Sequence, residues 1–249
     1  MRGNANAQKW RLIIDGPADA ATNMARDEAM LLAAQGVGLP ALRFYSWRPW
    51  ALSIGYFQHY AEFTAHAARG IPVVRRPTGG GAAYHADEVT YSLVGPFGRR
   101  PFPQRAAGIF EKVHTAIAGG LRGLGVDANL SDAPAGRSSV ICFARVQKYD
   151  IVVGGRKLVG SAQRRFKGRF LQQGSLLLSP NEFAPEAVTL GELVEKRPDT
   201  ATIVDALREA FEGMFGVRFV RGALTEEEEA AARRLAAEKY SGDRWNQRR

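Results

Sequence analysis

One cysteine and one lysine of this chain have the types and the spacing that nucleophilic acyl chemistry needs. Cys142 is the only cysteine, and it lies in the apolar segment 140–143, where a buried core thiol is the ordinary interpretation. Gly154-Gly155 predicts a two-residue hairpin turn that folds the following Arg156-Lys157 back along the chain. If Lys157 then lies near Cys142, its ammonium favours the thiolate, which is the form that attacks an acyl carbonyl.

The densest cluster of unusual residues is the segment 75–85, in which Gly79, Gly80 and Gly81 follow one another. Adjacent glycines permit positive φ angles and let a ligand approach the backbone, while Arg76 supplies hydrogen-bond donors beside them. Neither a phosphate-binding P-loop nor a dinucleotide fingerprint is present, because no Lys-Ser or Lys-Thr pair and no helix follows the glycines. A tight loop or bulge between two strands explains the glycines equally well.

The histidines do not form a metal-binding pattern. No His-Glu-x-x-His motif occurs, and a single cysteine excludes a zinc site built from paired cysteines. We therefore predict no metal site. The residues in question are His59, His66, His85 and His114.

The segment 156–169 contains six basic residues and no acidic residue, and the whole chain has a net charge of +9. Such a balance favours an acidic partner. Phe166 and Phe170 are the only aromatic residues in or beside the segment, and no nucleic-acid-binding motif accompanies it. A basic edge that meets an acidic protein explains the segment as well as binding of nucleic acid does.

Helices and strands must alternate along the chain to position these residues. Alternating apolar residues predict strands at 10–15, 43–47, 52–56, 71–76, 89–94, 149–153, 156–159 and 170–178. Apolar residues three or four positions apart predict helices at 20–35, 104–125, 203–215 and 226–239. Gly36 should end the first helix, and Thr225 with Glu228 should open the last one as a capping box. Because most strands are joined by short links, we predict an α+β fold with a mixed, largely antiparallel sheet flanked by helices.

The composition is that of a folded globular protein, with 249 residues, 45% hydrophobic and 24% charged. We predict one domain over residues 1–249, with a helical C-terminal segment at about 200–249. No apolar stretch is long enough to span a membrane, and the first residues lack the pattern of a signal peptide. Together with the single cysteine, these features predict a cytoplasmic protein without a membrane partner.

Several segments, taken together and in order, resemble the family of lipoate-protein ligases, octanoyl and lipoyl transferases and biotin-protein ligases. The resemblance covers about two thirds of the chain and rests on segments 10–15, 23–29, 52–58, 75–85 and 157–163. It implies a fold related to biotin synthetase and to the catalytic domains of class II aminoacyl-tRNA synthetases. Segment 245–249 also resembles the family's ending, which implies that the catalytic domain is complete.

Within the family, the chain is most similar to cysteine-dependent octanoyl-acyl carrier protein:protein N-octanoyltransferases. Cys142 stands at their nucleophile position upstream of segment 157–163, called the lysine motif below, and segments 89–92 and 149–153 also match that branch. The resemblance implies that Cys142 takes an octanoyl or lipoyl group from octanoyl-acyl carrier protein. A lysine of a lipoyl carrier protein then accepts it, either in the glycine cleavage H protein or in the lipoyl domain of a dehydrogenase E2 subunit.

The resemblance also implies roles for other residues. Lys157 stabilises the thiolate and the oxyanion, and transfer requires no cofactor. The alternative is a lipoate-protein ligase that uses ATP and Mg to form lipoyl-adenylate. Because acyl carrier proteins and lipoyl domains are typically acidic, we expect Arg164, Arg165 and Lys167 to contribute to docking. The residues implied to line or shape the substrate site are Arg76, Gly79, Gly80, Gly81, His85, Gly160 and Ser161, and a catalytic and a structural role both remain open for His85.

Overall fold

A computed structural model describes residues 7–33, 39–134 and 140–249 of the protein. Their largest element is a mixed sheet of eight strands in the order β11-β1-β2-β6-β10-β9-β8-β7. The strand β1 pairs in parallel with β2 and β11, whereas the other neighbours are antiparallel. The strands are β1 (Gln8–Ala18), β2 (Ala41–Trp47), β6 (Glu88–Pro96), β7 (Asn129–Leu130), β8 (Ile151–Val153), β9 (Arg156–Phe166), β10 (Arg169–Leu177) and β11 (Val217–Gly222).

A second, three-stranded sheet in the order β4-β3-β5 carries the segment around the three glycines. Its strands are β3 (Ala51–Ile54), β4 (Val73–Arg75) and β5 (Ala83–His85). Short helical segments precede β4, namely a 3-10 turn (Tyr60–Phe63) and α2 (Thr64–Ala68). The glycines therefore connect β4 to β5, and one short strand lies between them and the predicted strand at 89–94.

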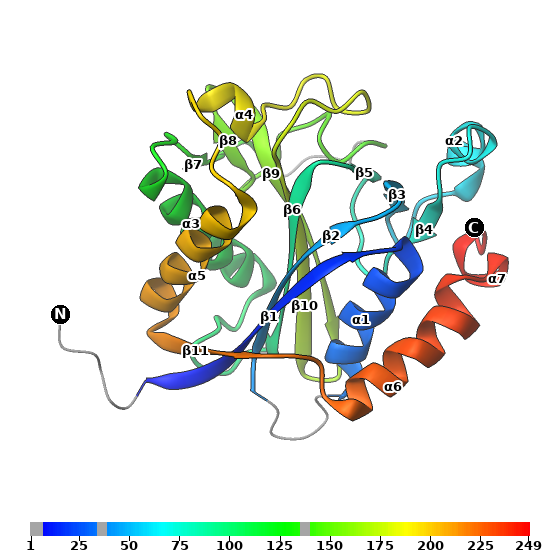
Figure 1. The fold of residues 1–249 in the computed structure, drawn as a ribbon, viewed down its shortest axis with the longest axis horizontal. Coiled ribbons are helices and arrows are strands. Elements are labelled where there is room, and N and C mark those ends of the chain that lie inside the picture. The colour runs from blue at the N-terminus through cyan, green and yellow to red at the C-terminus, as the bar shows by residue number, and fades with distance from the viewer. Residues whose placement is uncertain (1–6, 34–38, 135–139) are drawn as a thin grey trace.

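Helices cover both faces of the main sheet (Figure 1). On one face α3 (Ala106–Gly123) packs against α5 (Thr200–Phe215), and Trp10 lies in the apolar core beneath them. On the other face α1 (Ala20–Ala33) packs against α6 (Glu226–Leu235). The remaining helices are α4 (Leu190–Leu193) and α7 (Asp243–Asn246). Within the described residues, no helix is long and apolar enough to cross a membrane.

The predicted fold class is confirmed, and the differences are local. The strand predicted at 156–159 continues to Phe166, and the helix predicted at 226–239 ends at Leu235. A wider π turn over Ala236–Tyr240 follows, and it brings Lys239 and Tyr240 within 2.6 and 2.8 Å of the Glu28 carboxylate. The residues predicted to end the first helix, Gln35 and Gly36, lie outside the described part of the chain.

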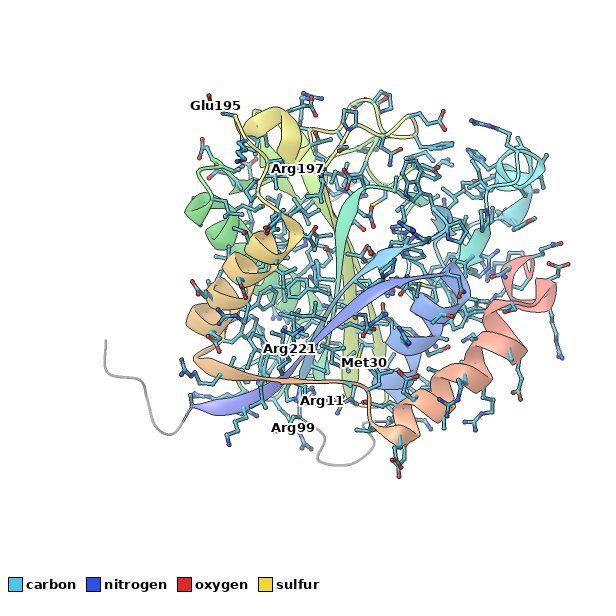
Figure 2. The ribbon with its side chains drawn as sticks, in the orientation of Figure 1. Arg11, Met30, Arg99, Glu195, Arg197 and Arg221 are labelled. Carbon is cyan, nitrogen blue, oxygen red and sulfur yellow. The ribbon has the colours of Figure 1, made fainter. Side chains whose placement is uncertain are left out.

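Three strands were not predicted, namely β5, β7 and β11. The strand β11 forms the parallel edge of the main sheet, and most of its side chains are exposed, so an apolar alternation is absent. Figure 2 shows Arg11 and Arg221 near this edge. Arg11 forms an ion pair of 2.6 Å with Glu228 and thereby connects the edge of the sheet to α6.

Candidate active site

The hairpin between β8 and β9 brings Lys157 to Cys142. Gly154 and Gly155 form its turn with φ angles of 56° and 78°, which residues other than glycine rarely adopt. The Lys157 Nζ lies 3.8 Å from the Cys142 Sγ and donates a hydrogen bond of 2.9 Å to the Cys142 carbonyl oxygen. The Cys142 backbone N–H in turn donates to the carbonyl oxygen of Ala82 at 2.7 Å, which places the cysteine beside the glycine segment.

The lysine also forms a buried ion pair that sequence reasoning missed. Lys157 is only 4% exposed, and its Nζ lies 2.8 Å from the Asp150 Oδ2. Burial opposes the charge on Lys157, but the neighbouring Cys142 and Asp150 raise the pKa of the ammonium above its usual value. The lysine is therefore held as a cation beside the thiol. In the sequence, Asp150 lies inside the matching segment 149–153 and directly before the apolar strand β8, but no pattern there pairs it with Lys157.

Gly160 provides the space in which the cysteine and the lysine meet. A Cβ at this position would lie 2.6 Å from the Lys157 Cε and 3.2 Å from the Cys142 Sγ. Any larger residue must therefore push the ammonium away from the sulfur. This gives Gly160 of the lysine motif a steric role.

We expect Gly160→Ala to lower the acyl transfer that the family resemblance implies by about 100-fold, because a displacement of roughly 1 Å at reacting groups has effects of that size. Single-turnover rates measure the effect. Gly119→Ala is the matched control, because a Cβ on Gly119 meets no atom within 4 Å. Equal transfer rates for the two variants would contradict the steric role of Gly160.

Two cavities meet at the cysteine. The inner cavity lies between the main sheet and the small sheet, and the outer, wider cavity opens beside α3. Cys142, Ser161 and Ala162 line both cavities. Residues that line only the inner cavity include Met24, Tyr45, Trp47, Ser53, Arg76, Ala83, His85 and Thr90, and residues that line only the outer one include Gly79, Gly80, Gly81, Phe110, Gln147, Asp150 and Lys157.

The predicted substrate residues thus divide between the two cavities. The three glycines line the outer cavity, whereas Arg76 and His85 line the inner one. Buried Arg76 shapes the glycine segment, because its Nη2 donates to the carbonyl oxygens of Gly79 at 2.6 Å and Gly81 at 2.7 Å. Neighbouring Gly55 is equally constrained, since a Cβ there would lie 2.0 Å from the Gly80 oxygen.

His85 is held on both sides of its ring. Its Nδ1 lies 2.6 Å from the Glu88 Oε1, and its Nε2 lies 2.7 Å from the Ser53 Oγ. Its ring also stacks on Trp47, with centroids 3.9 Å apart. Because both ring nitrogens already have buried partners, the arrangement favours a structural role for His85 as a wall of the inner cavity.

A second histidine contacts the lysine motif and was not singled out from the sequence. The Nδ1 of His114 lies 2.6 Å from the Tyr149 carbonyl oxygen, so this nitrogen carries the proton. Its Nε2 then accepts a hydrogen bond of 2.6 Å from Ser161, whose Oγ accepts one of 2.7 Å from the hydroxyl of Tyr91. Tyr149 has a φ angle of 68°, which aims its carbonyl group at His114. These bonds fix the Ser161 hydroxyl on the α3 side of β9.

Burial lowers the pKa of His114 to about 4, so the histidine is neutral near pH 7. In the unfolded chain the same imidazole has the ordinary histidine pKa of about 6.5. The stabilising contribution of neutral His114 is therefore fully present above that pH and is lost as pH falls toward 4. The free energy of unfolding should be lower by roughly 2–3 kcal/mol at pH 4.5. Urea unfolding should show this loss of stability in the wild type, and the loss should be absent in His114→Gln. Exposed His59→Gln is the control, and an equal acid slope for all three proteins would refute the assignment.

A mixed sheet, the glycine segment and a buried lysine beside two joined cavities thus make up the candidate active site. The chain belongs to the lipoyl protein ligase A/B catalytic domain family, whose model matches residues 19–212. This confirms the predicted family.

Individual relatives resemble the chain over almost its whole length. It is 39% identical to octanoyltransferase LipM of Kyrpidia tusciae, over 97% of this chain and 100% of that protein. Its structure is similar to that of Ta0514, a putative lipoate protein ligase from T. acidophilum with bound lipoic acid, with a TM-score of 0.85, 27% identity and coverage of 97% and 100%. A bi-partite lipoate protein ligase from Thermoplasma acidophilum, described with its E2 lipoyl domain, has a TM-score of 0.78, 26% identity and coverage of 96% of each chain.

Proposed function

We propose that this protein transfers an octanoyl group from acyl carrier protein to a lysine of a lipoyl carrier domain through a thioester on Cys142. The observation that carries the proposal is the distance of 3.8 Å between the Cys142 Sγ and the Lys157 Nζ at the junction of two cavities. Full-length similarity to an octanoyltransferase supports the acyl group, and a related ligase described with its E2 lipoyl domain supports the acceptor.

In the first half-reaction the Cys142 thiolate attacks the thioester carbonyl of octanoyl-acyl carrier protein. The tetrahedral oxyanion collapses, the bond to the carrier sulfur breaks, and the carrier leaves as a thiolate that takes a proton from solvent. In the second half-reaction the neutral amine of the acceptor lysine attacks the acyl-enzyme, the thiolate leaves, and the nitrogen loses a proton to solvent as the amide forms. Lys157 stabilises negative charge on the sulfur and on the oxyanion. Because the donor thioester is already activated, this route uses no cofactor.

The decisive experiment is incubation with octanoyl-acyl carrier protein in the absence of ATP. Intact-mass measurement should show one added octanoyl group on the protein and none on Cys142→Ser. If a carrier lysine is modified only when free lipoate, ATP and Mg are supplied, the ligase alternative is correct and the transferase proposal is wrong.

The basic residues predicted for docking do not form one surface. The Nη1 of Arg164 lies 3.4 Å from the Pro77 oxygen, next to the glycine segment. Arg165 follows it in β9 and so points to the opposite face, over the ring of Phe97. Lys167 lies in the turn after β9, roughly 20 Å along the strand from Gly160.

Other basic residues lie beside the glycine segment instead. The guanidinium of Arg248 lies 4.1 Å from the centre of the Tyr56 ring, and that of Arg249 lies 5.7 Å from the Phe57 ring. Phe57 is 65% exposed, and its ring lies 3.8 Å from a Cβ position on Gly79. We propose that an acidic carrier docks on this surface of Tyr56, Phe57, Arg164, Arg248 and Arg249.

Neutralising Arg164, Arg248 and Arg249 with glutamine should slow transfer at low salt by about 10-fold and flatten its salt dependence, because complementary charge mainly accelerates encounter. The matched control is the double variant Arg165→Gln, Lys167→Gln, which we expect to stay close to the wild type. Transfer rates at several salt concentrations measure both. If the control variant loses more rate than the triple variant, the carrier docks elsewhere.

A further inference from the structure

The direction of one hydrogen-bond chain beside the outer cavity is fixed by a single backbone atom. The carbonyl oxygen of Tyr149 can only accept, so the Nδ1 of His114, 2.6 Å away, carries the proton. Because burial lowers the pKa of His114 to about 4, the ring is neutral near pH 7 and its Nε2 is an acceptor. The Ser161 Oγ lies 2.6 Å from this nitrogen. The one hydrogen of the Ser161 hydroxyl therefore points at His114.

The same direction continues across the sheet. Because the Ser161 hydrogen is already used, the Tyr91 hydroxyl is the donor in the bond of 2.7 Å between them. Tyr91 in turn accepts from the Gln172 Nε2 at 3.0 Å, which turns the Gln172 Oε1 toward Gln163. The Gln163 Nε2 donates to that oxygen at 3.1 Å. Each side-chain amide of the chain thus has one orientation, and the Gln163 Oε1 lies at the end of the chain.

Gly174 makes the central bond of the chain possible. Ser161 of β9 pairs with Gly174 of β10, and Gly174 pairs with Tyr91 of β6. A Cβ on Gly174 would lie 2.1 Å from the Ser161 Oγ and 2.5 Å from the Tyr91 Cε1. The two hydroxyl groups meet across an intervening strand because this glycine leaves the gap. Ser161 is therefore held from two sides, by His114 of α3 and by Tyr91.

The chain ends on a wall of the outer cavity. Ser161 and Gln163 are two positions apart in β9, so they point to the same face, and both line this cavity. Ser161 directly follows Gly160, whose Cβ position lies 3.2 Å from the Cys142 Sγ. The wall next to the cysteine therefore offers oxygen atoms that accept hydrogen bonds, while the Ser161 hydrogen points away from the cavity.

Lys157, the cation of the same cavity, already uses its hydrogens. One N–H of its ammonium points to the Asp150 Oδ2 at 2.8 Å, and another donates to the Cys142 carbonyl oxygen at 2.9 Å. The third is left for the Cys142 sulfur at 3.8 Å or for the oxyanion that forms beside it. Lys157 therefore has no hydrogen that would bind the lone pair of an incoming nitrogen.

An amine attacks a thioester only when its lone pair faces the carbonyl carbon, so its N–H groups must be held elsewhere. We propose that the outer cavity admits the acceptor lysine and that Ser161 orients its amine by accepting an N–H hydrogen bond, an inference that rests on the proposed acyl transfer. The Gln163 Oε1 gives a second acceptor farther along β9. The C–N bond forms, the C–S bond to Cys142 breaks, and the nitrogen proton passes to solvent.

His114 is then a positioning residue. It does not contact the amine, but it keeps the hydrogen of Ser161 turned away from the cavity. Without this imidazole the Ser161 hydroxyl can rotate and donate to the lone pair of the amine, which blocks the attack. The neutral state of His114 is thus part of how the site selects an amine.

The test uses isolated octanoyl-Cys142 protein and two nucleophiles, the lysine of a lipoyl domain and the thiol of acyl carrier protein. Ser161→Ala and His114→Phe should slow attack by the lysine by about 10-fold, the effect of one hydrogen bond, and should change attack by the thiol little. Gln163→Leu should give a smaller drop in the lysine rate. The exposed Ser241→Ala is the matched control and should keep both rates. Equal slowing of both nucleophiles, or no slowing of either, would overturn the proposal.

A second measurement needs no variant of this chain. A lipoyl domain with a diazirine analogue of lysine at the acceptor position, irradiated with the wild-type protein, should cross-link to Phe110 or Gln163, which line the outer cavity alone. Cross-links to Ala83 or Thr90, which line the inner cavity alone, would overturn the proposal even if the variants fail to fold. If the wild type takes no octanoyl group from any donor, the proposed function itself fails, and that outcome is distinct from a misplaced amine.

Discussion

Cys142→Ala should reduce octanoyl transfer by about 10⁴-fold or more, since loss of a covalent nucleophile has effects of this size in enzymes that form acyl intermediates. The cysteine is partly buried against a small apolar cluster that includes Phe143 and Leu177. Removal of its sulfur should therefore cost no more than about 1 kcal/mol of stability. The loss of activity is then chemical and not a result of unfolding.

Two measurements decide this prediction. Single-turnover transfer from octanoyl-acyl carrier protein to a lipoyl domain gives the rate, and intact mass gives the acyl-enzyme. Cys142→Ser keeps the shape of the side chain and should bind the donor without forming a stable intermediate. Transfer by Cys142→Ala at a wild-type rate without ATP would show that the acyl group passes directly between the carriers.

Lys157→Met should slow transfer by about 10²–10³-fold, the effect of removing one donor to an oxyanion. It should also slow alkylation of Cys142 by iodoacetamide at pH 7, because no ammonium then stabilises negative charge on the sulfur. The variant leaves the buried Asp150 carboxylate without its cation, which we expect to destabilise the fold by roughly 3–5 kcal/mol.

The ion pair offers a control that separates fold from chemistry. In the double variant Asp150→Asn, Lys157→Met both charges are gone, so most of the lost stability should return while the transfer rate stays low. Urea unfolding and single-turnover rates on the same samples measure the two quantities. If the double variant regains stability and activity together, Lys157 serves the fold alone.

The sequence predicted best those features that depend on neighbouring residues. The Gly154-Gly155 turn and the alternation around it place Lys157 next to the strand before it, and the structure then brings the lysine to Cys142. The triple glycine likewise indicated a segment of close backbone contact. The glycines line the outer cavity and not the inner one, because Arg76 donates hydrogen bonds to the carbonyl oxygens of Gly79 and Gly81. No local sequence pattern reveals these contacts.

What the sequence by itself determined was the family, the α+β class and the pair of residues suited to covalent chemistry, because turn residues, apolar periodicity and motif spacing act over a few positions. Only the tertiary structure decided which buried groups surround that pair. His114 contacts Ser161 across 47 positions, and Trp47 contacts Thr90 across 43. The first contact comes from the packing of α3 against the sheet, and the second comes from the register of β2 and β6, which is set by the packing of both faces of the sheet. The charge partner of the lysine and the neutral histidine therefore became visible only in the folded chain.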